Sequence, residues 1–175
     1  MDYAIMLCFD KETESYFNDI ITSIAASGAS DYMIDAKAIP HITIADFHTE
    51  KIGDVISVLE ENISGFISGE VMWASLGSFV PWVLFAAPVM NEYLHNACVR
   101  INSLIEPLAT HCGSGQYLPY KWVPHTTLAS RLNHDSLKKA FGVAMQKFSA
   151  IKGTCNRISL IQCSPFQEIK TWSLL

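Results

Sequence analysis

Basic residues are scarce in this sequence. Only 12 Lys and Arg stand against 17 Asp and Glu among 175 residues, so the formal net charge is −5. A protein that grips long nucleic acid presents a broad basic surface, which displaces counterions from the phosphates, and this composition excludes such a surface. Half of the residues are apolar and 17% are charged, which is typical of a globular chain with a full-sized core. A nucleic-acid partner would therefore have to bind at a small, local site.

Long hydrophobic segments are also missing. No uninterrupted apolar run reaches the roughly 18 residues that a membrane helix needs, since the longest candidate, 79–90, is broken by Pro81 and Pro88. The N-terminus begins directly with an alternating strand pattern and lacks the basic and apolar regions of a signal peptide. The sequence therefore predicts a cytoplasmic protein without membrane attachment.

The cysteines form no pattern that is typical of a disulfide framework or a zinc site. Their number is odd, and no Cys-x-x-Cys pair is present. We expect small core residues of a reducing cytosol and no metal or other cofactor. The five are Cys8, Cys98, Cys112, Cys155 and Cys163.

The chain repeats one order of predicted elements. The segments of the first half are 3–9, 11–27, 40–44, 52–63 and 71–80. Those of the second half are 83–90, 91–108, 124–128, 134–148 and 157–163, and 168–174 adds a hairpin strand. Each half reads strand, helix, short strand, helix, strand, and Asp10 and Asn91 are placed to cap the first helix of each half. This predicts an α+β protein of one domain, residues 1–175, with two similar lobes of about 1–80 and 81–175 facing each other across a cleft.

The short strand of each half opens with the motif Pro-His-x-Thr. Side chains alternate between the faces of a strand, so His41 and Thr43 point to one side, and His125 and Thr127 do the same in the second half. The preceding prolines lack an N–H, which is tolerable at the first residue of a strand. Each half therefore offers one imidazole and one hydroxyl to the cleft.

This pairing suits the cleavage of a phosphoester. The attacking oxygen must lose a proton and the leaving oxygen must gain one, roughly in line through phosphorus. Two histidines with pKa values near 6.5 can hold opposite protonation states at neutral pH, one as base and the other as acid. Threonine hydroxyls can donate hydrogen bonds to the other phosphate oxygens, and this division of labour requires no metal.

A structural explanation has to be weighed against the catalytic one. A single histidine in a strand is more often a satisfied structural residue than a catalyst, and a duplication could have copied a structural motif. However, two histidines, each preceded by Pro and followed by x-Thr, stand at equivalent points of a repeated architecture. This coincidence favours chemistry.

The segments His41-Ile42-Thr43-Ile44 and His125-Thr126-Thr127-Leu128 resemble the paired His-h-(Thr/Ser)-h motifs of the 2H phosphoesterase superfamily, where h is hydrophobic. The superfamily includes the 2′-5′ RNA ligase / RNA 2′,3′-cyclic phosphodiesterase family, and the resemblance covers essentially the whole chain. It implies a bilobal, internally duplicated α+β fold, with two antiparallel sheets lining a central cleft and helices outside. It also implies metal-independent hydrolysis of a 2′,3′-cyclic phosphate or a 2′-5′ bond, with both histidines catalytic and both threonines on the phosphate.

Some positions depart from this pattern. Thr126 occupies a slot that is usually hydrophobic, although its methyl group can still pack on a strand face. Asp46 follows the first motif, where a negative charge is unfavourable for a phosphate unless it faces away. Strand alternation puts His48 on the face opposite to His41, and we expect His48 at the surface of the following loop.

Residues around the second motif are candidate substrate contacts. Lys121 and Arg131 could bind a phosphate, and family members often carry a basic residue soon after the second motif. Tyr120 and Trp122 could stack on a base, although each aromatic could equally be a core residue.

We therefore expect a monomeric phosphodiesterase that acts on RNA ends or small nucleotide cyclic phosphates, and not on DNA or at a membrane. The rival hypothesis is a non-catalytic nucleotide- or RNA-binding module that uses the same cleft. Hydrolysis of a phosphodiester without metal separates the two. The motifs leave open the exact substrate, which histidine is the acid, and whether 2′-5′ ligation also occurs.

Overall fold

The computed structural model describes residues 1–175, and the predicted order of elements is confirmed. The strands are β1 (Asp2–Phe9), β2 (His41–His48), β3 (Gly69–Phe79), β4 (Val83–Pro88), β5 (Thr110–His111), β6 (Thr126–Ala129), β7 (Ile151–Gln162) and β8 (Gln167–Ser173). The helices are α1 (Lys11–Ala26), α2 (Tyr32–Asp35), α3 (Ile52–Asn62), α4 (Glu92–Ile105) and α5 (His134–Lys147), and a 3₁₀ turn covers Ile63–Gly65. The short elements α2 and β5 are not predicted by the periodicity, and β2 is longer than expected. None of the helices has the length and apolar character needed to cross a membrane.

Side chains in front of the helices determine where they begin. Asp10 accepts a hydrogen bond from the backbone N–H of Thr13, and Asn91 accepts one from that of Leu94, both at 2.9 Å. Both predicted caps are confirmed. Each cap satisfies an N–H that the first helical turn leaves without a partner, which typically contributes about 1 kcal/mol. Asp10 also accepts from the N–H of Thr154 at 2.7 Å and thereby ties the start of α1 to β7.

The strands form one antiparallel sheet in the order β5-β2-β1-β7-β3-β4-β6, with β8 paired to β7. Without β5 and β8, the order reads β2-β1-β7 from one end and β6-β4-β3 from the other. The first-half strands β2, β1 and β3 correspond to β6, β4 and β7 of the second half. Each strand lies as far from one end of the sheet as its counterpart lies from the other end. This symmetry confirms the internal duplication. The two sheets expected at the cleft are continuous, because β3 and β7 pair along Gly69–Trp73 where they pass from one lobe to the other.

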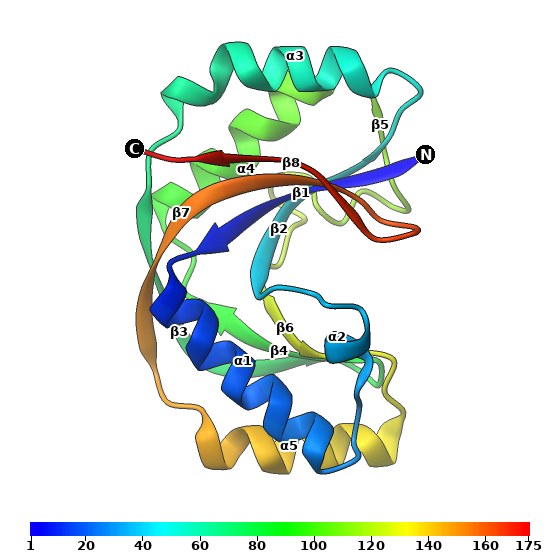
Figure 1. Cartoon of the computed structure of the whole chain (residues 1–175), viewed down its shortest axis with the longest axis vertical. Coiled ribbons are helices and arrows are strands. Elements are labelled where there is room, and N and C mark those ends of the chain that lie inside the picture. The colour runs from blue at the N-terminus through cyan, green and yellow to red at the C-terminus, as the bar shows by residue number, and fades with distance from the viewer.

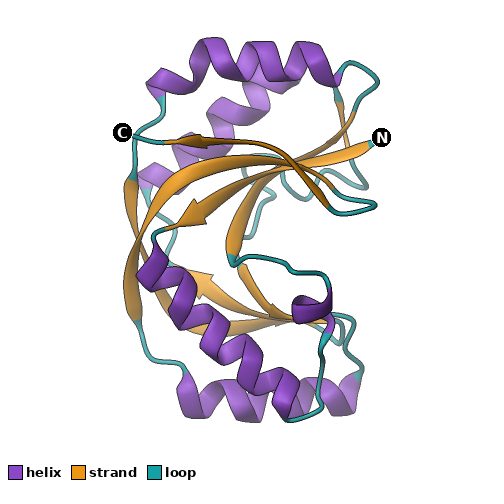
Figure 2. Ribbon diagram, in the orientation of Figure 1, coloured by secondary structure: helices purple, strands orange, loops and turns teal.

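Each lobe combines elements from both halves of the sequence (Figure 1). The first-motif lobe contains β1, β2, β5, β7, β8, α3 and α4, and the second-motif lobe contains β3, β4, β6, α1, α2 and α5. Helix α1 packs against α5 and β6, whereas α4 packs against α3 and β2. Figure 2 shows the strands of both lobes on the inside and the helices around them. The point near residue 80 therefore separates the sequence repeats, while the lobes in space exchange helices and closing strands.

The core is continuous between the lobes. Trp73 of β3 is fully buried, and its ring centroid lies 4.9 Å from that of Phe9 and 5.1 Å from that of Phe17, both in edge-on contacts. Phe9 at the end of β1 thereby packs against a strand of the other lobe, and Phe17 of α1 joins the same cluster. Three cysteines, Cys8, Cys98 and Cys155, are buried as expected, whereas Cys112 and Cys163 lie nearer the surface. The expectation of a core position is wrong for the last two.

Candidate active site

The two predicted histidines are held in the same way. His41 begins β2 and His125 directly precedes β6. Nδ1 of His41 lies 2.7 Å from the carbonyl oxygen of Ile39, and Nδ1 of His125 lies 2.8 Å from that of Val123. A carbonyl oxygen only accepts, so Nδ1 carries the hydrogen in both rings and the neutral imidazole keeps its lone pair on Nε2. Neither Nε2 has a partner in the protein. Both rings are therefore presented in one tautomer with the same nitrogen free.

The proline of each motif lies within this hydrogen-bonded turn. Pro40 stands between Ile39 and His41, and Pro124 takes the same place before His125. The proline ring fixes its own φ angle and restricts the residue before it, so the accepting carbonyl has little freedom to turn away from the imidazole. The prolines thus have a positioning role, beyond being tolerated at the start of a strand.

The first motif strand carries a β-bulge. Thr43 is paired with Met6, but the next residue of β1, Ile5, is paired with Ala45, so Ile44 is the extra residue. A bulge resets the alternation of side chains along a strand. Both Ile44 and Ala45 consequently belong to the main core.

The second motif strand has the same irregularity at Leu128. Thr127 and Ala129 are paired with consecutive residues of β4. The pattern of burial is identical in the two strands, since the residue after each histidine is buried, the threonine is partly exposed and the next two residues are buried. The duplication therefore extends beyond the four motif residues to the local geometry of the backbone.

Burial favours the neutral form of both histidines. For His41, burial is the largest influence and lowers the pKa. The hydrogen bond to Ile39 raises the pKa, and the nearby charge of His125 lowers it further. Burial also lowers the pKa of His125, and the bond to Val123 opposes it. The two imidazoles are near enough for the charge on His125 to act on His41. A negatively charged group beside an imidazole has the opposite effect, since it favours the protonated ring.

A pocket of about 420 Å³ lies against the second motif. The predicted residues His125, Thr127, Lys121 and Trp122 line it, and Lys121 is its only Lys or Arg. The other lining residues are Phe79, Val83, Gln116, Tyr117 and Val123. The pocket thus combines the second motif, the loop before it and the hairpin between β3 and β4.

Tyr117 connects the two motifs and is not predicted by the sequence. Its ring centroid lies 6.2 Å from that of His125. Burial raises the pKa of its hydroxyl to about 12, with the negative charge of Asp46 adding to this, while the nearby Thr43 side chain acts in the opposite direction. The phenol therefore remains a hydrogen-bond donor at neutral pH. Tyr117 belongs to an irregular loop, where no periodicity indicates the direction of a side chain.

Two phenylalanines hold the ring of His125. The centroid of Phe79 lies 5.0 Å and that of Phe85 5.4 Å from the imidazole. A Cβ on Gly77 would lie 2.4 Å from the ring of Phe85, so the glycine allows this ring to lie against β3. These aromatic rings restrict the orientation of His125 and keep water from one side of it. The sequence predicts only that Phe79 and Phe85 lie in the strands 71–80 and 83–90, and it does not predict their contact with His125.

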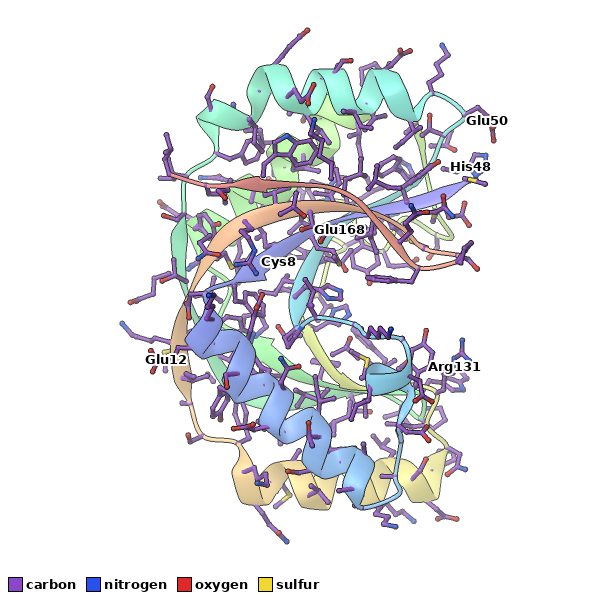
Figure 3. The ribbon with its side chains drawn as sticks, in the orientation of Figure 1. Cys8, Glu12, His48, Glu50, Arg131 and Glu168 are labelled. Atoms are coloured by element: carbon purple, nitrogen blue, oxygen red, sulfur yellow. The ribbon has the colours of Figure 1, made fainter.

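Two predicted contacts lie outside the pocket. Tyr120 is 92% exposed, and its ring packs on His95 of α4 at 5.2 Å. The guanidinium of Arg131 lies 4.1 Å from the ring centroid of Tyr32, beside α2 (Figure 3). The backbone of Arg131 has a φ of 57°, so the chain turns away directly after the motif strand. The substrate contacts expected from these two residues have no geometric support.

Two other residues near the second motif serve the core. Thr126 is fully buried, and its hydroxyl accepts a hydrogen bond of 3.0 Å from the indole N–H of Trp73. A hydroxyl in this slot thus satisfies a donor that would otherwise be buried without a partner. Trp122 is 8% exposed, so it can offer a base only the small part that lines the pocket.

The C-terminal end of β2 differs from what strand alternation predicts. The bulge places Asp46 opposite Ala4, on the same face as His41 and Thr43, so Asp46 does not face away from the site. His48 is the last residue of β2 and not part of a loop, and the bulge puts it on this same face. It is exposed at the end of β2 (Figure 3). Its Nδ1 lies 3.0 Å from the Asp2 carboxylate.

The polar side chains that the two motifs present are imidazoles and hydroxyls. Nowhere in residues 1–175 do three or more His, Cys, Asp or Glu side chains gather in an arrangement that could hold a metal ion. The motifs and the loop before β6 contribute two imidazoles, His41 and His125, and three hydroxyls, those of Thr43, Thr127 and Tyr117.

The duplicated strand order and the two matched motifs define a 2H phosphoesterase fold. Among solved structures, the chain is similar to TT0787 of Thermus thermophilus, with a TM-score of 0.65 and 14% identity over 99% of this chain and 98% of that one. It is also similar to E. coli LigT complexed with NADP+ (TM-score 0.55, 13% identity, 98% and 96% covered) and to Kluyveromyces marxianus Usb1 (0.51, 8%, 96% and 97%). No family model and no curated protein matches the sequence. The resemblance inferred from the motifs is confirmed at the level of the fold, over nearly the whole chain.

Proposed function

We propose that this protein is a metal-independent phosphodiesterase that hydrolyses the 2′,3′-cyclic phosphate of an RNA end or a small nucleotide. The observation that carries the proposal is the identical presentation of His41 and His125. Each donates Nδ1–H to the carbonyl two residues earlier and keeps Nε2 free. A buried histidine with a purely structural role is expected to pair both ring nitrogens, whereas His41 and His125 each leave Nε2 without a partner.

The arrangement accounts for each proton of the reaction. One imidazole takes a proton from the attacking water, and the other, protonated, gives its proton to the ribose oxygen as its bond to phosphorus breaks. The product is a phosphate monoester with a free neighbouring hydroxyl. Thr43 and Thr127 donate to the oxygens that gain charge, and Lys121 adds a positive charge at the pocket. Exchange with water then removes the proton from the first imidazole and restores one to the second, which readies the pair for the next turnover.

The size and charge of the site favour a single nucleotide as the recognised unit. The pocket contains one cation, and the chain carries a net charge of −5. Few phosphates can therefore be neutralised, and the salt dependence of binding should be shallow. Nucleotides are bound by proteins of the same fold: a LigT structure contains NADP+, and a Usb1 structure with a TM-score of 0.51 contains uridine monophosphate.

Hydrolysis of the four nucleoside 2′,3′-cyclic phosphates in excess EDTA tests the proposal, with the position of the product phosphate assigned by NMR. We expect turnover that the chelator leaves unchanged. Activity that is lost with EDTA and restored by Mg²⁺ or Zn²⁺ would establish a metal-dependent phosphoesterase instead. Binding of the nucleotides without any turnover would favour the non-catalytic nucleotide-binding module.

A further inference from the structure

The loop of residues 112–125 passes the first motif before it reaches the second. It connects β5 in the first-motif lobe with β6 in the second-motif lobe (Figure 1). Strand β5 has only two residues, which pair with the last two of β2, so strand pairing does not extend to the loop. Tyr117 of this loop nevertheless lies near the Thr43 side chain, with its ring 6.2 Å from that of His125. Contacts other than strand pairing therefore hold the loop at this point.

Asn102 of α4 supplies such a contact. Its side chain is buried, and Nδ2 lies 3.1 Å from the carbonyl oxygen of Ile44, 3.3 Å from that of Tyr117 and 2.9 Å from that of Cys98. Ile44 is the bulged residue that follows Thr43. The amide nitrogen has two hydrogens, so one group serves the motif strand, the loop and its own helix. Sγ of Cys98, one helical turn earlier, lies 3.6 Å from the same carbonyl oxygen of Tyr117. The backbone beside Thr43 and the backbone of Tyr117 are thus held by one side chain.

The corresponding helix of the other lobe has no such amide. Counted from the N-cap of each helix, the place of Asn102 in α4 is that of Ile21 in α1. Ile21 is buried and apolar, and α1 packs on the strand of the second motif as α4 packs on that of the first. Packing of a helix on a motif strand therefore does not require an amide. A buried amide is costly unless it is hydrogen-bonded, so the two carbonyl groups that Asn102 joins account for its presence.

We propose that Asn102 is a positioning residue of the phosphate site and sets the distance between the hydroxyls of Thr43 and Tyr117. This rests on the proposed function, because Thr43 donates to the phosphate there. Asn102 does not line the pocket beside the second motif, so it acts through the backbones of the strand and the loop. A misplacement of about 1 Å can cost roughly 10²-fold in rate. Loss of the amide should therefore lower kcat more than it raises KM.

Asn102→Leu keeps the approximate volume of the side chain and removes both donors. We expect kcat for a nucleoside 2′,3′-cyclic phosphate to fall about tenfold, with KM changed less than about twofold. The loss from Tyr117→Phe, about fivefold in the unmodified protein, should shrink to less than about twofold in the Asn102→Leu background. A purely structural role would reduce the amount of folded enzyme and leave the effect of Tyr117→Phe unchanged, which would overturn the proposal.

Asn102→Ser provides the same test with a polar side chain, for use if the apolar variant does not fold. Its hydroxyl can bond to the carbonyl oxygen of Cys98, one turn earlier, but is too short to reach Ile44 or Tyr117. We expect the same two results as for Asn102→Leu. A serine variant with normal kcat and a normal effect of Tyr117→Phe would overturn the proposal.

Thr49→Val is the matched control. Thr49 follows β2 and is buried, and its hydroxyl donates to the carbonyl oxygen of Leu108, which follows α4, at 2.8 Å. The variant removes a buried hydrogen bond between segments that adjoin the same strand and helix, without a contact to Tyr117. It should lower stability and leave kcat and the effect of Tyr117→Phe unchanged. Equal loss of the Tyr117→Phe effect in Thr49→Val would contradict a specific role of Asn102.

Hydrogen exchange followed by mass spectrometry tests the contact without turnover. Residues 112–125 should exchange faster in both Asn102 variants than in the unmodified protein or in Thr49→Val. Unchanged exchange of this loop in the Asn102 variants would overturn the positioning role even if kcat falls. Absence of turnover in the unmodified protein would instead remove the proposed function, and the exchange data would then decide alone whether Asn102 holds the loop.

Discussion

The two half-sites of this protein agree in their motifs and differ in what surrounds them. Around His41 the strand face continues to Asp46, and the floor consists of small or flexible side chains of β1, among them Met6 and Cys8. Around His125 the neighbours are the rings of Phe79 and Phe85, with the pocket beside them. The hydrogen bond that orients each imidazole and the bulge that follows it are the same in both.

This difference separates two tasks. The groups that handle protons and phosphate oxygens have to act from opposite sides of one phosphorus atom, so a symmetric pair suits them. The rest of a nucleotide has no such symmetry, and the surroundings of the two motifs are accordingly unlike. The comparison predicts that changes within the motifs have equal effects in both halves, whereas changes around them do not.

The histidines should give the largest effects and the most symmetric ones. His41→Ala and His125→Ala are each expected to lower kcat about 10²–10⁴-fold, since each removes a general acid or base. The double variant should be little worse than either single one, because both act in one step. Steady-state hydrolysis of a cyclic nucleotide measures this, with circular dichroism to verify the fold. Normal turnover in either single variant would rule out the paired mechanism.

The threonines test whether the phosphate is held symmetrically. Thr43→Val and Thr127→Val keep the shape of the side chain and remove the hydroxyl, so we expect each to lower kcat roughly 10²-fold. Thr126→Val serves as a control for the neighbouring position, and it should reduce stability by orphaning the indole N–H of Trp73 while sparing kcat. A loss confined to one of the two motif threonines would show that only one half-site binds the phosphate.

Tyr117 should give a smaller and one-sided effect. Tyr117→Phe keeps the ring beside His125 and removes the hydroxyl that lies near the Thr43 side chain. We expect kcat to fall about fivefold, the worth of one hydrogen bond. In the Thr43→Val background the same change should have almost no effect, because its partner is already gone. If the losses in kcat from Tyr117→Phe and Thr43→Val add fully, the Tyr117 hydroxyl does not act through Thr43.

The smallest expected effect is on the pH dependence of stability. The folded-state pKa of both histidines is lowered, so the unfolded chain binds protons first and stability falls as the pH drops below about 6.5. Above that pH the histidines are neutral in both states and this contribution is complete. His41→Gln and His125→Gln should each flatten the dependence, because each variant removes one buried histidine together with the influence of His125 on His41. Urea midpoints between about pH 7.5 and about pH 5.5 measure it, with the exposed His134→Gln as control. Unchanged slopes in both variants would contradict the burial of the pair.

Much of this structure could be predicted from the sequence because the apolar residues of its strands and helices recur with a regular period. The alternation in the strands and the helical spacing in 11–27 and 134–148 depend on local burial, which a sequence records directly. The motifs predicted the facing of His41 and Thr43 for the same reason. The bulges also left a signal: the consecutive apolar pairs Ile44-Ala45 and Leu128-Ala129 break the alternation at the same point of each repeat. Without the bulge, alternation puts His48 on the wrong face.

Other parts of the site depend on contacts between distant segments. Tyr117 lies in a loop whose course is determined by packing on β2 and α4; for instance, Asn102 donates to the carbonyl oxygen of Tyr117 at 3.3 Å. Arg131 is drawn to Tyr32, a residue about 100 positions earlier in a short helix that no periodicity indicated. The exchange of helices between lobes is likewise invisible to local patterns, since the order of elements is the same with or without it.

That exchange has a consequence for the synthesis of the chain. Helix α1 leaves the ribosome early, but its apolar face is covered by β6 and α5, which are made only after residue 125. Residues 1–80 alone therefore leave uncovered the face of α1 that packs on β6 and α5, and no lobe can be completed while the second half is still being synthesised. An interlocked repeat of this kind folds as one unit after translation. Expressing residues 1–80 and 81–175 separately should therefore yield two insoluble fragments, neither of which is functional.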